Sequence, residues 1–157
     1  MRVLAFDPGY ERLGVAVIEK QNGKEVLLHS DCIRTSANTT FAVRIAALGD
    51  AVEQLIAAWQ PTAIALENLY FENNAKTAMN VSAVRGMLLY LAARNGLVTH
   101  EYTPLQVKVA VTGNGKSDKA AIALMVPKLV SISRGKRLDD ELDAIAVGIT
   151  CLASVRN

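Results

Sequence analysis

RVLAFDPGYERLGVAVIEKQNGKEVLLHSDCIR, at residues 2–34, contains three strand patterns joined by two turns. The apolar runs Arg2–Phe6, Leu13–Glu19 and Val26–Arg34 are typical of β-strands. The first connection contains Pro8-Gly9-Tyr10, and the second contains Asn22-Gly23, a common hairpin turn. Three strands joined by such short turns predict an antiparallel meander.

Beyond the meander, helix and strand patterns alternate. We expect a helix from Thr39 or Thr40 to about Trp59, a strand at Thr62–Glu67, a helix from Asn74 to Arg94 and a strand at Leu97–Tyr102. Three helices should follow, at Pro104–Val111, from a Ser117 cap to a kink or end at Pro127, and from about Leu138 to Val155. The predicted order is βββαβαβααα. This order predicts an α/β fold with a five-stranded mixed sheet, three antiparallel strands followed by parallel ones, and helices on both faces.

Length and composition favour a single domain over residues 1–157. The apolar runs are too short for a signal peptide or a membrane span, so we expect no membrane association. Cys32 and Cys151 lack metal-ligand spacing and are expected to be two reduced thiols in the core, which favours a cytoplasmic location.

The charge is unevenly distributed along the chain. Residues 74–137 contain ten basic and two acidic residues, a net charge of +8, which leaves −6 for the remainder of a chain whose total is +2. A basic surface beside an acidic cluster suits a polyanionic substrate brought to a metal site. The alternative is a set of solvated lysines and arginines on helix faces.

Four carboxylates stand beside apolar runs, where an isolated charge is costly. Asp7 ends the first strand, Glu67 ends the fourth, and Asp140 and Asp143 are spaced to lie on one face of the last helix. In a mixed sheet Asp7 and Glu67 can be neighbours, with the last helix above them. Four oxygen ligands favour magnesium or manganese over zinc.

Each acid also has a simpler interpretation. Asp7 could be a turn residue, Glu67 a cap, and Asp140 and Asp143 first-turn acids that complement the helix dipole. We assign this last role to their neighbours Asp139 and Glu141. Two divalent ions held roughly 4 Å apart by the four acids could hydrolyse a phosphodiester without a protein nucleophile.

The chain resembles the RuvC-type Holliday-junction resolvases over nearly its whole length. The matching pieces are Asp7-Pro8-Gly9 with Gly14, Cys32-Ile33-Arg34-Thr35, Glu67-Asn68-Leu69-Tyr70-Phe71 with Asn74, Ala83-Val84-Arg85-Gly86, Gln106-Val107-Lys108, Gly113-x-Gly115 with Lys119, and Asp140-x-x-Asp143-Ala144-x-Ala146. The chain departs from the family pattern at Ala16, Asn73, Val84 and Pro127, and none of these departures touches the four acids.

The resemblance implies an RNase H-like fold and a homodimer that nicks two strands of a four-way DNA junction during recombination and repair. It makes Asp7, Glu67, Asp140 and Asp143 the ligands of two Mg²⁺ ions, with Mn²⁺ as a substitute. It also implies the branch-migration proteins RuvA and RuvB as partners. The expected DNA-binding residues are Tyr70, Phe71, Asn74, Arg85, Lys108, Lys116 and Lys119.

Tyr70 and Phe71 fall where the family has an aromatic residue that stacks near the junction centre, although core packing is an alternative. The helix from Asn74 to Arg94 is apolar over a wide arc, so part of it could pack against a second subunit.

Three other functions compete with junction resolution. Another RNase H-fold nuclease, acting on flaps, hybrids or transposon ends, would use the same acids. A junction-binding module without catalysis would not need them all. An actin- or sugar-kinase-like ATPase would need two domains and a second glycine-rich loop, for which 157 residues leave no room.

Overall fold

A computed structural model of the chain describes residues 1–68, 75–130 and 138–155. Its elements are β1 (Arg2–Asp7), β2 (Arg12–Gln21), β3 (Lys24–Arg34), α1 (Phe41–Trp59), β4 (Ala63–Glu67), α2 (Ala75–Arg94), β5 (Val98–Tyr102), α3 (Pro104–Thr112), α4 (Lys119–Leu129) and α5 (Asp139–Ser154). The predicted order of elements is confirmed. The second and third strands run further toward the Asn22-Gly23 turn than the apolar pattern indicated.

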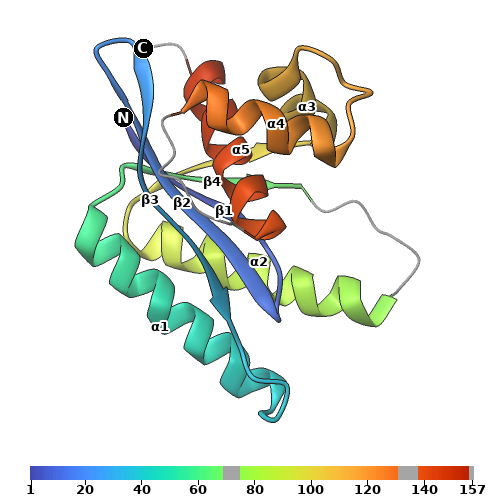
Figure 1. Cartoon of the computed structure of the whole chain (residues 1–157). Helices are drawn as coiled ribbons and strands as arrows, with labels where there is room; N and C mark the ends of the chain where they lie inside the picture. Colours follow the sequence, from blue (N-terminus) through green and yellow to red (C-terminus); the bar gives the residue numbers. More distant parts are fainter. Residues whose placement is uncertain (69–74, 131–137, 156–157) are drawn as a thin grey trace.

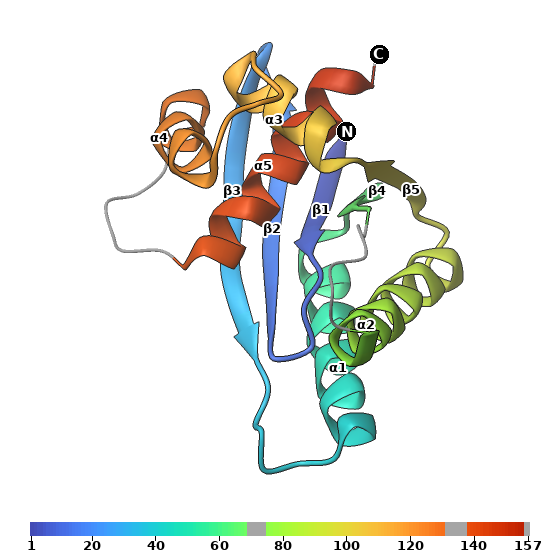
Figure 2. The same cartoon turned by 90° about the vertical axis from the view of Figure 1, so that its right-hand side faces the viewer.

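The five strands form one mixed sheet in the order β3-β2-β1-β4-β5. β1 pairs antiparallel with β2 and parallel with β4, while β2–β3 is antiparallel and β4–β5 is parallel. Helices α1 and α2 lie on one face of this sheet, and α3, α4 and α5 lie on the other (Figures 1 and 2). The predicted mixed sheet with helices on both faces is therefore confirmed.

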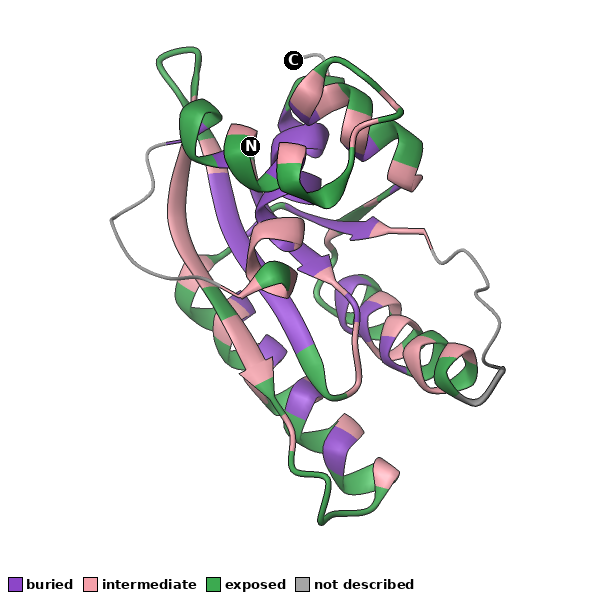
Figure 3. Ribbon diagram, turned by 45° about the vertical axis from the view of Figure 1, so that its right-hand side comes forward, coloured by how far each residue is buried: buried purple, intermediate pink, exposed green. Residues whose placement is uncertain are grey.

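The apolar side chains form two cores, one on each face of the sheet. Alternation along β1 directs Leu4 and Phe6 toward α1 and α2, and Val3 and Ala5 toward α5. The central strands and the middle of α5 are buried, whereas β3 at the sheet edge is only half-buried along most of its length (Figure 3). The strands that carry the site thus run through the best-packed part of the molecule.

The helix ends agree with the prediction except at α4. Asp118, not Ser117, caps this helix, because its carboxylate accepts a hydrogen bond from the backbone N–H of Ala121 at 2.9 Å. The Ser117 hydroxyl is instead hydrogen-bonded to the Thr112 hydroxyl, at 2.8 Å. Pro127 lies inside α4, in its last turn, and the helix ends two residues later.

The remaining caps support the predicted boundaries. Thr40 caps α1, and Pro104 begins α3 behind a capping box formed by Thr103 and Gln106. Both cysteines are free thiols, and Cys151 is buried in α5 as expected. The expected core position is wrong for Cys32, which is only half-buried because β3 is an edge strand. Among the described residues, no helix is both long enough and apolar enough to cross a membrane.

Candidate active site

The fold gathers the four predicted carboxylates at one end of the sheet. Phe6 pairs with Leu66 in the parallel ladder, so the residues that follow them, Asp7 and Glu67, lie at the same end of the sheet. Asp140 and Asp143 lie at the start of α5, which packs against β1 and β2.

Gly14 determines how closely α5 approaches this end of the sheet. It is paired with Asp7 across the β1–β2 ladder. A Cβ at Gly14 would lie 1.9 Å from the backbone oxygen of Asp140, so only glycine lets the start of the helix rest on β2 at this point. The same residue therefore faces Asp7 along the sheet and Asp140 above it.

The four acids lie close enough together for their charges to affect one another's pKa values. The pKa of Asp7 is raised to about 7, first by burial and then by the charges of Asp143, Glu67 and Asp140. The pKa of Glu67 is also raised, by burial and by Asp143, while Lys119 and Lys108 lower it. Burial is thus the largest cause of the raised pKa at both acids, and repulsion from neighbouring carboxylates adds to it.

Two basic side chains lie against the acids from α5. Lys119 Nζ donates a hydrogen bond to Asp143 Oδ2 at 3.1 Å, and this bond is the main reason that the pKa of Lys119 is raised. Arg12 Nε lies 3.2 Å from Asp140 Oδ2 without making a hydrogen bond. That buried oxygen accepts no hydrogen bond from any described residue.

The donor set fits divalent cations that prefer oxygen. Four carboxylates, two of them with raised pKa values, and a buried carboxylate oxygen without a hydrogen bond match the needs of Mg²⁺ or Mn²⁺. Within residues 1–68, 75–130 and 138–155, however, no three Asp, Glu, His or Cys side chains are arranged to hold one ion as they stand. Asp140 and Asp143 lie against Arg12 and Lys119 instead.

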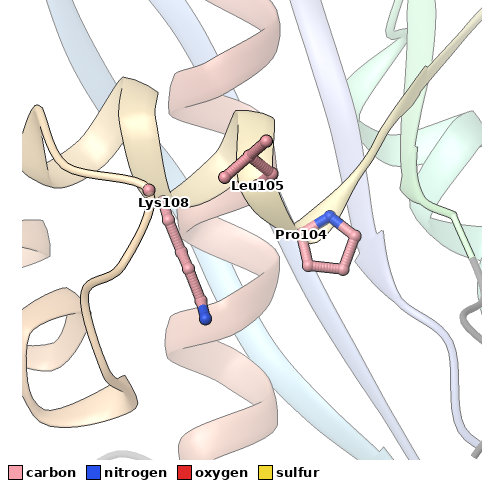
Figure 4. A pocket seen from close by; sticks show the side chains of 4 residues that line it. Pro104, Leu105 and Lys108 are labelled. Carbon is pink, nitrogen blue, oxygen red and sulfur yellow. The ribbon is translucent and has the colours of Figure 1, made fainter.

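The predicted lysines lie on the side of the sheet that carries α5. Lys119 begins α4, Lys116 is exposed in the preceding loop, and Lys108 is on α3. Lys108 lines an open hollow of about 250 Å³ with Pro104, Leu105 and Gly115 (Figure 4). Its effect on the pKa of Glu67 places this hollow near the acids.

Arg85, another predicted DNA-binding residue, is not brought to the carboxylates. Arg85 forms an ion pair with Glu101 of β5, and α2 covers the opposite face of the sheet (Figure 2). The Arg85 Nε is buried and has no hydrogen-bond partner among the described residues. Tyr70, Phe71 and Asn74 lie outside the described residues.

The two acids assigned to the helix dipole do lie in the first turn of α5. Glu141 also accepts a hydrogen bond from the Ser30 hydroxyl at 2.6 Å, which ties α5 to β3. The sequence reasoning missed Arg12. Its position could have revealed it. Arg12 precedes Gly14 by two residues, so strand alternation directs it to the same face of the sheet as the acids.

A mixed five-stranded sheet with acids at the ends of β1 and β4 and at the start of α5 defines the RNase H-like class of nucleases. The structure of the yeast mitochondrial Holliday junction resolvase Ydc2 has the same fold, with a TM-score of 0.72 at 14% identity, and is covered over 77% of its length by 96% of this chain. The family model for crossover junction endodeoxyribonuclease RuvC matches residues 3–151. The chain belongs to the RuvC family.

Individual relatives match over nearly the whole chain. The crossover junction endodeoxyribonuclease RuvC of Heliobacterium modesticaldum is 39% identical over 155 residues, which is 99% of this chain and 96% of the relative. The structure of T. thermophilus RuvC in complex with a Holliday junction substrate matches with a TM-score of 0.89 and 30% identity, and covers 96% of this chain and 92% of its own. The resemblance inferred from the motifs is thus confirmed.

Proposed function

We propose that the chain is a structure-selective endonuclease that resolves four-way DNA junctions by paired nicks in opposing strands, in recombination and repair. One observation carries the proposal: the fold brings four carboxylates to one end of the sheet, where burial and then the charges of the other three acids raise the pKa of Asp7 to about 7. Membership of the RuvC family and the likeness to a relative bound to a Holliday junction support it.

Asp7, Glu67, Asp140 and Asp143 would hold two Mg²⁺ ions, with Mn²⁺ as a substitute. When bound, such ions lower the pKa of a water molecule and stabilise negative charge on a phosphodiester. The chain's own residues supply the rest of the site. Asp7 and Glu67 are half-buried at the ends of their strands, and Gly14 sets the height of Asp140 above the sheet.

Lys108, Lys116 and Lys119 would contact the DNA backbone beside the acids. Lys108 and Lys119 act electrostatically on Glu67, and Lys116 is exposed on the loop between their helices. Lys119 would exchange Asp143 for a phosphate once cations occupy the acids. Roles for Tyr70, Phe71, Asn74 and Arg85 in DNA binding stay predictions.

The proposed enzyme acts as a homodimer through α2. Along its outer face the helix exposes Met79, Ala83, Gly86 and Tyr90 at helical spacing, with Met79 72% exposed and Tyr90 61% exposed. A Cβ at Gly86 would meet nothing within 4 Å, so this glycine leaves room for a close partner helix. Two sites related by a two-fold axis would nick opposing strands of a symmetric junction. Partnership with RuvA and RuvB stays a prediction.

The test is to incubate the protein with a synthetic four-way junction and Mg²⁺ and to map nicks on all four strands. Paired nicks in opposing strands, absent from linear duplex and lost in Asp7→Asn while junction binding survives, are the expected result. Cutting of flaps or hybrids in place of junctions would keep the metal chemistry and change the substrate. Tight junction binding without nicks would make the protein a binding module.

A further inference from the structure

Two arginines lie opposite each other at the end of the sheet that carries the acids. Arg12 begins β2, Arg34 ends β3, and the two are paired directly across the antiparallel ladder. Both are exposed. Alternation directs them to the same face as Gly14 and Cys32, which are the next pair of that ladder on this face. This is the face on which Asp140 of α5 rests.

The electrostatics around Cys32 supports this placement. The pKa of its thiol is raised first by burial and then by the charge of Asp140, while Arg12 and Arg34 both lower it. Both guanidinium groups and the carboxylate therefore act on one side chain. The arginines lie beside the acidic cluster, at the strand ends, whereas Lys108 and Lys119 reach it from α3 and α4.

Neither arginine donates a hydrogen bond to a carboxylate of the described residues. Like charges directly opposite each other on neighbouring strands are destabilising. No ion pair joins Arg34 to another residue of the described ranges, and Arg12 has only Asp140, at 3.2 Å and without a hydrogen bond. An anion placed between the two guanidinium groups would remove this repulsion.

We propose that Arg12 and Arg34 form a phosphate-binding site for the DNA strand that lies across the acids. The inference rests on the proposed function and adds a substrate contact to it. A guanidinium presents paired N–H donors to phosphate oxygens, so two facing arginines can hold one phosphate from both sides. A cation on Asp140 would neutralise the carboxylate that Arg12 faces and leave Arg12 free for that phosphate.

Junction binding by fluorescence anisotropy, over a series of salt concentrations, provides the readout. It uses the full chain in the Asp7→Asn background with Mg²⁺, so that no cleavage intervenes. Arg12→Gln, Arg34→Gln and the double variant are compared with Arg94→Gln, whose ion pair with Glu53 joins α2 to α1 on the other face of the sheet. Thermal unfolding of each variant checks the fold.

We expect each single variant to weaken junction binding by on the order of tenfold and to reduce the salt slope by about one. The double variant should lose less than the two single losses combined, because one phosphate is shared. Arg12→Lys with Arg34→Lys should keep most of the salt slope. Equal affinity and slope in the double variant and in Arg94→Gln would overturn the proposal.

Neutralising single phosphates identifies the contact directly. Junctions with one methylphosphonate at each successive position near the expected nick are bound to the Asp7→Asn protein and to its double arginine variant. At one position the methylphosphonate should weaken junction binding by the Asp7→Asn protein and leave binding by the double arginine variant unchanged. A scan in which no position has this effect would overturn the proposal. The proposed function fails separately, if the protein prefers linear duplex to junctions, and the arginine contact can then still be scored on the duplex.

Discussion

Asp7→Asn should stabilise the cation-free protein at pH 8, although it removes a proposed ligand. The pKa of Asp7 rises from 3.8 to about 7, chiefly through burial. One pH unit corresponds to about 1.4 kcal/mol, so the ionised Asp7 costs the folded state roughly 4 kcal/mol. Asparagine keeps nearly the same shape and carries no charge, and the substitution should therefore recover most of this free energy.

The effect has a defined pH window. Below about pH 4, Asp7 is protonated in both the folded and the unfolded chain, and its cost vanishes. Between about pH 4 and pH 7 the folded chain binds the additional proton, so the free energy of unfolding decreases as pH rises. Above about pH 7 both states are ionised and the full cost is present. Glu67, whose pKa is also raised, contributes in the same direction.

Urea and thermal unfolding in EDTA provide the assay, with the exposed acid Asp50→Asn as the control. At pH 8, Asp7→Asn should unfold about 8–16 °C higher than the unsubstituted protein, and at pH 5 the gain should shrink to roughly a third. Added Mg²⁺ should then stabilise the unsubstituted protein more than the variant. Equal stability of the two proteins at pH 8 would refute the view that Asp7 is charged and half-buried beside the other acids.

Three further substitutions probe separate parts of the molecule. Gly14→Ala should push α5 away from β2, cost roughly 1–3 kcal/mol in urea unfolding and weaken Mn²⁺ binding in calorimetry; unchanged values would contradict the seating of α5 on glycine. Gly86→Leu should leave the unfolding of each chain intact but shift sedimentation toward the monomer, since a Cβ at this position meets nothing within 4 Å in one subunit; a dimer of normal stability would exclude α2 as the interface. Lys119→Ala should reduce the salt slope of junction binding by about one, and an unchanged slope would leave it a solvated residue.

Local patterns were sufficient for the parts of the fold that depend on neighbours in sequence. The turn at Asn22-Gly23 and the alternation along β1 predicted the meander, and acids adjoining buried strands predicted the place of Asp7 and Glu67. The choice of helix cap could not be read in this way. Ser117 and Asp118 are both good caps, and only the hydrogen bond between Ser117 and Thr112 explains why Asp118 takes the role.

The role of Arg12 was hidden for a similar reason. It faces Asp140, which comes near it only after β2 and α5 have packed together. Arg85, whose role at the DNA stays a prediction, is paired with Glu101 on the face of the sheet away from the acids. The partners of such side chains cannot be predicted from the sequence, because they come from distant parts of the chain and no local pattern encodes them.

The contact at Gly14 has a consequence for how the protein opens. α5 meets β2 backbone against backbone there, and Ala144–Leu152 behind it are buried without interruption. The helix that carries two of the acids therefore belongs to the same cooperative unit as the central strands, and amide hydrogen exchange in both should proceed at the rate of global unfolding. We therefore expect the acidic site and the central strands to unfold together, in one thermal transition.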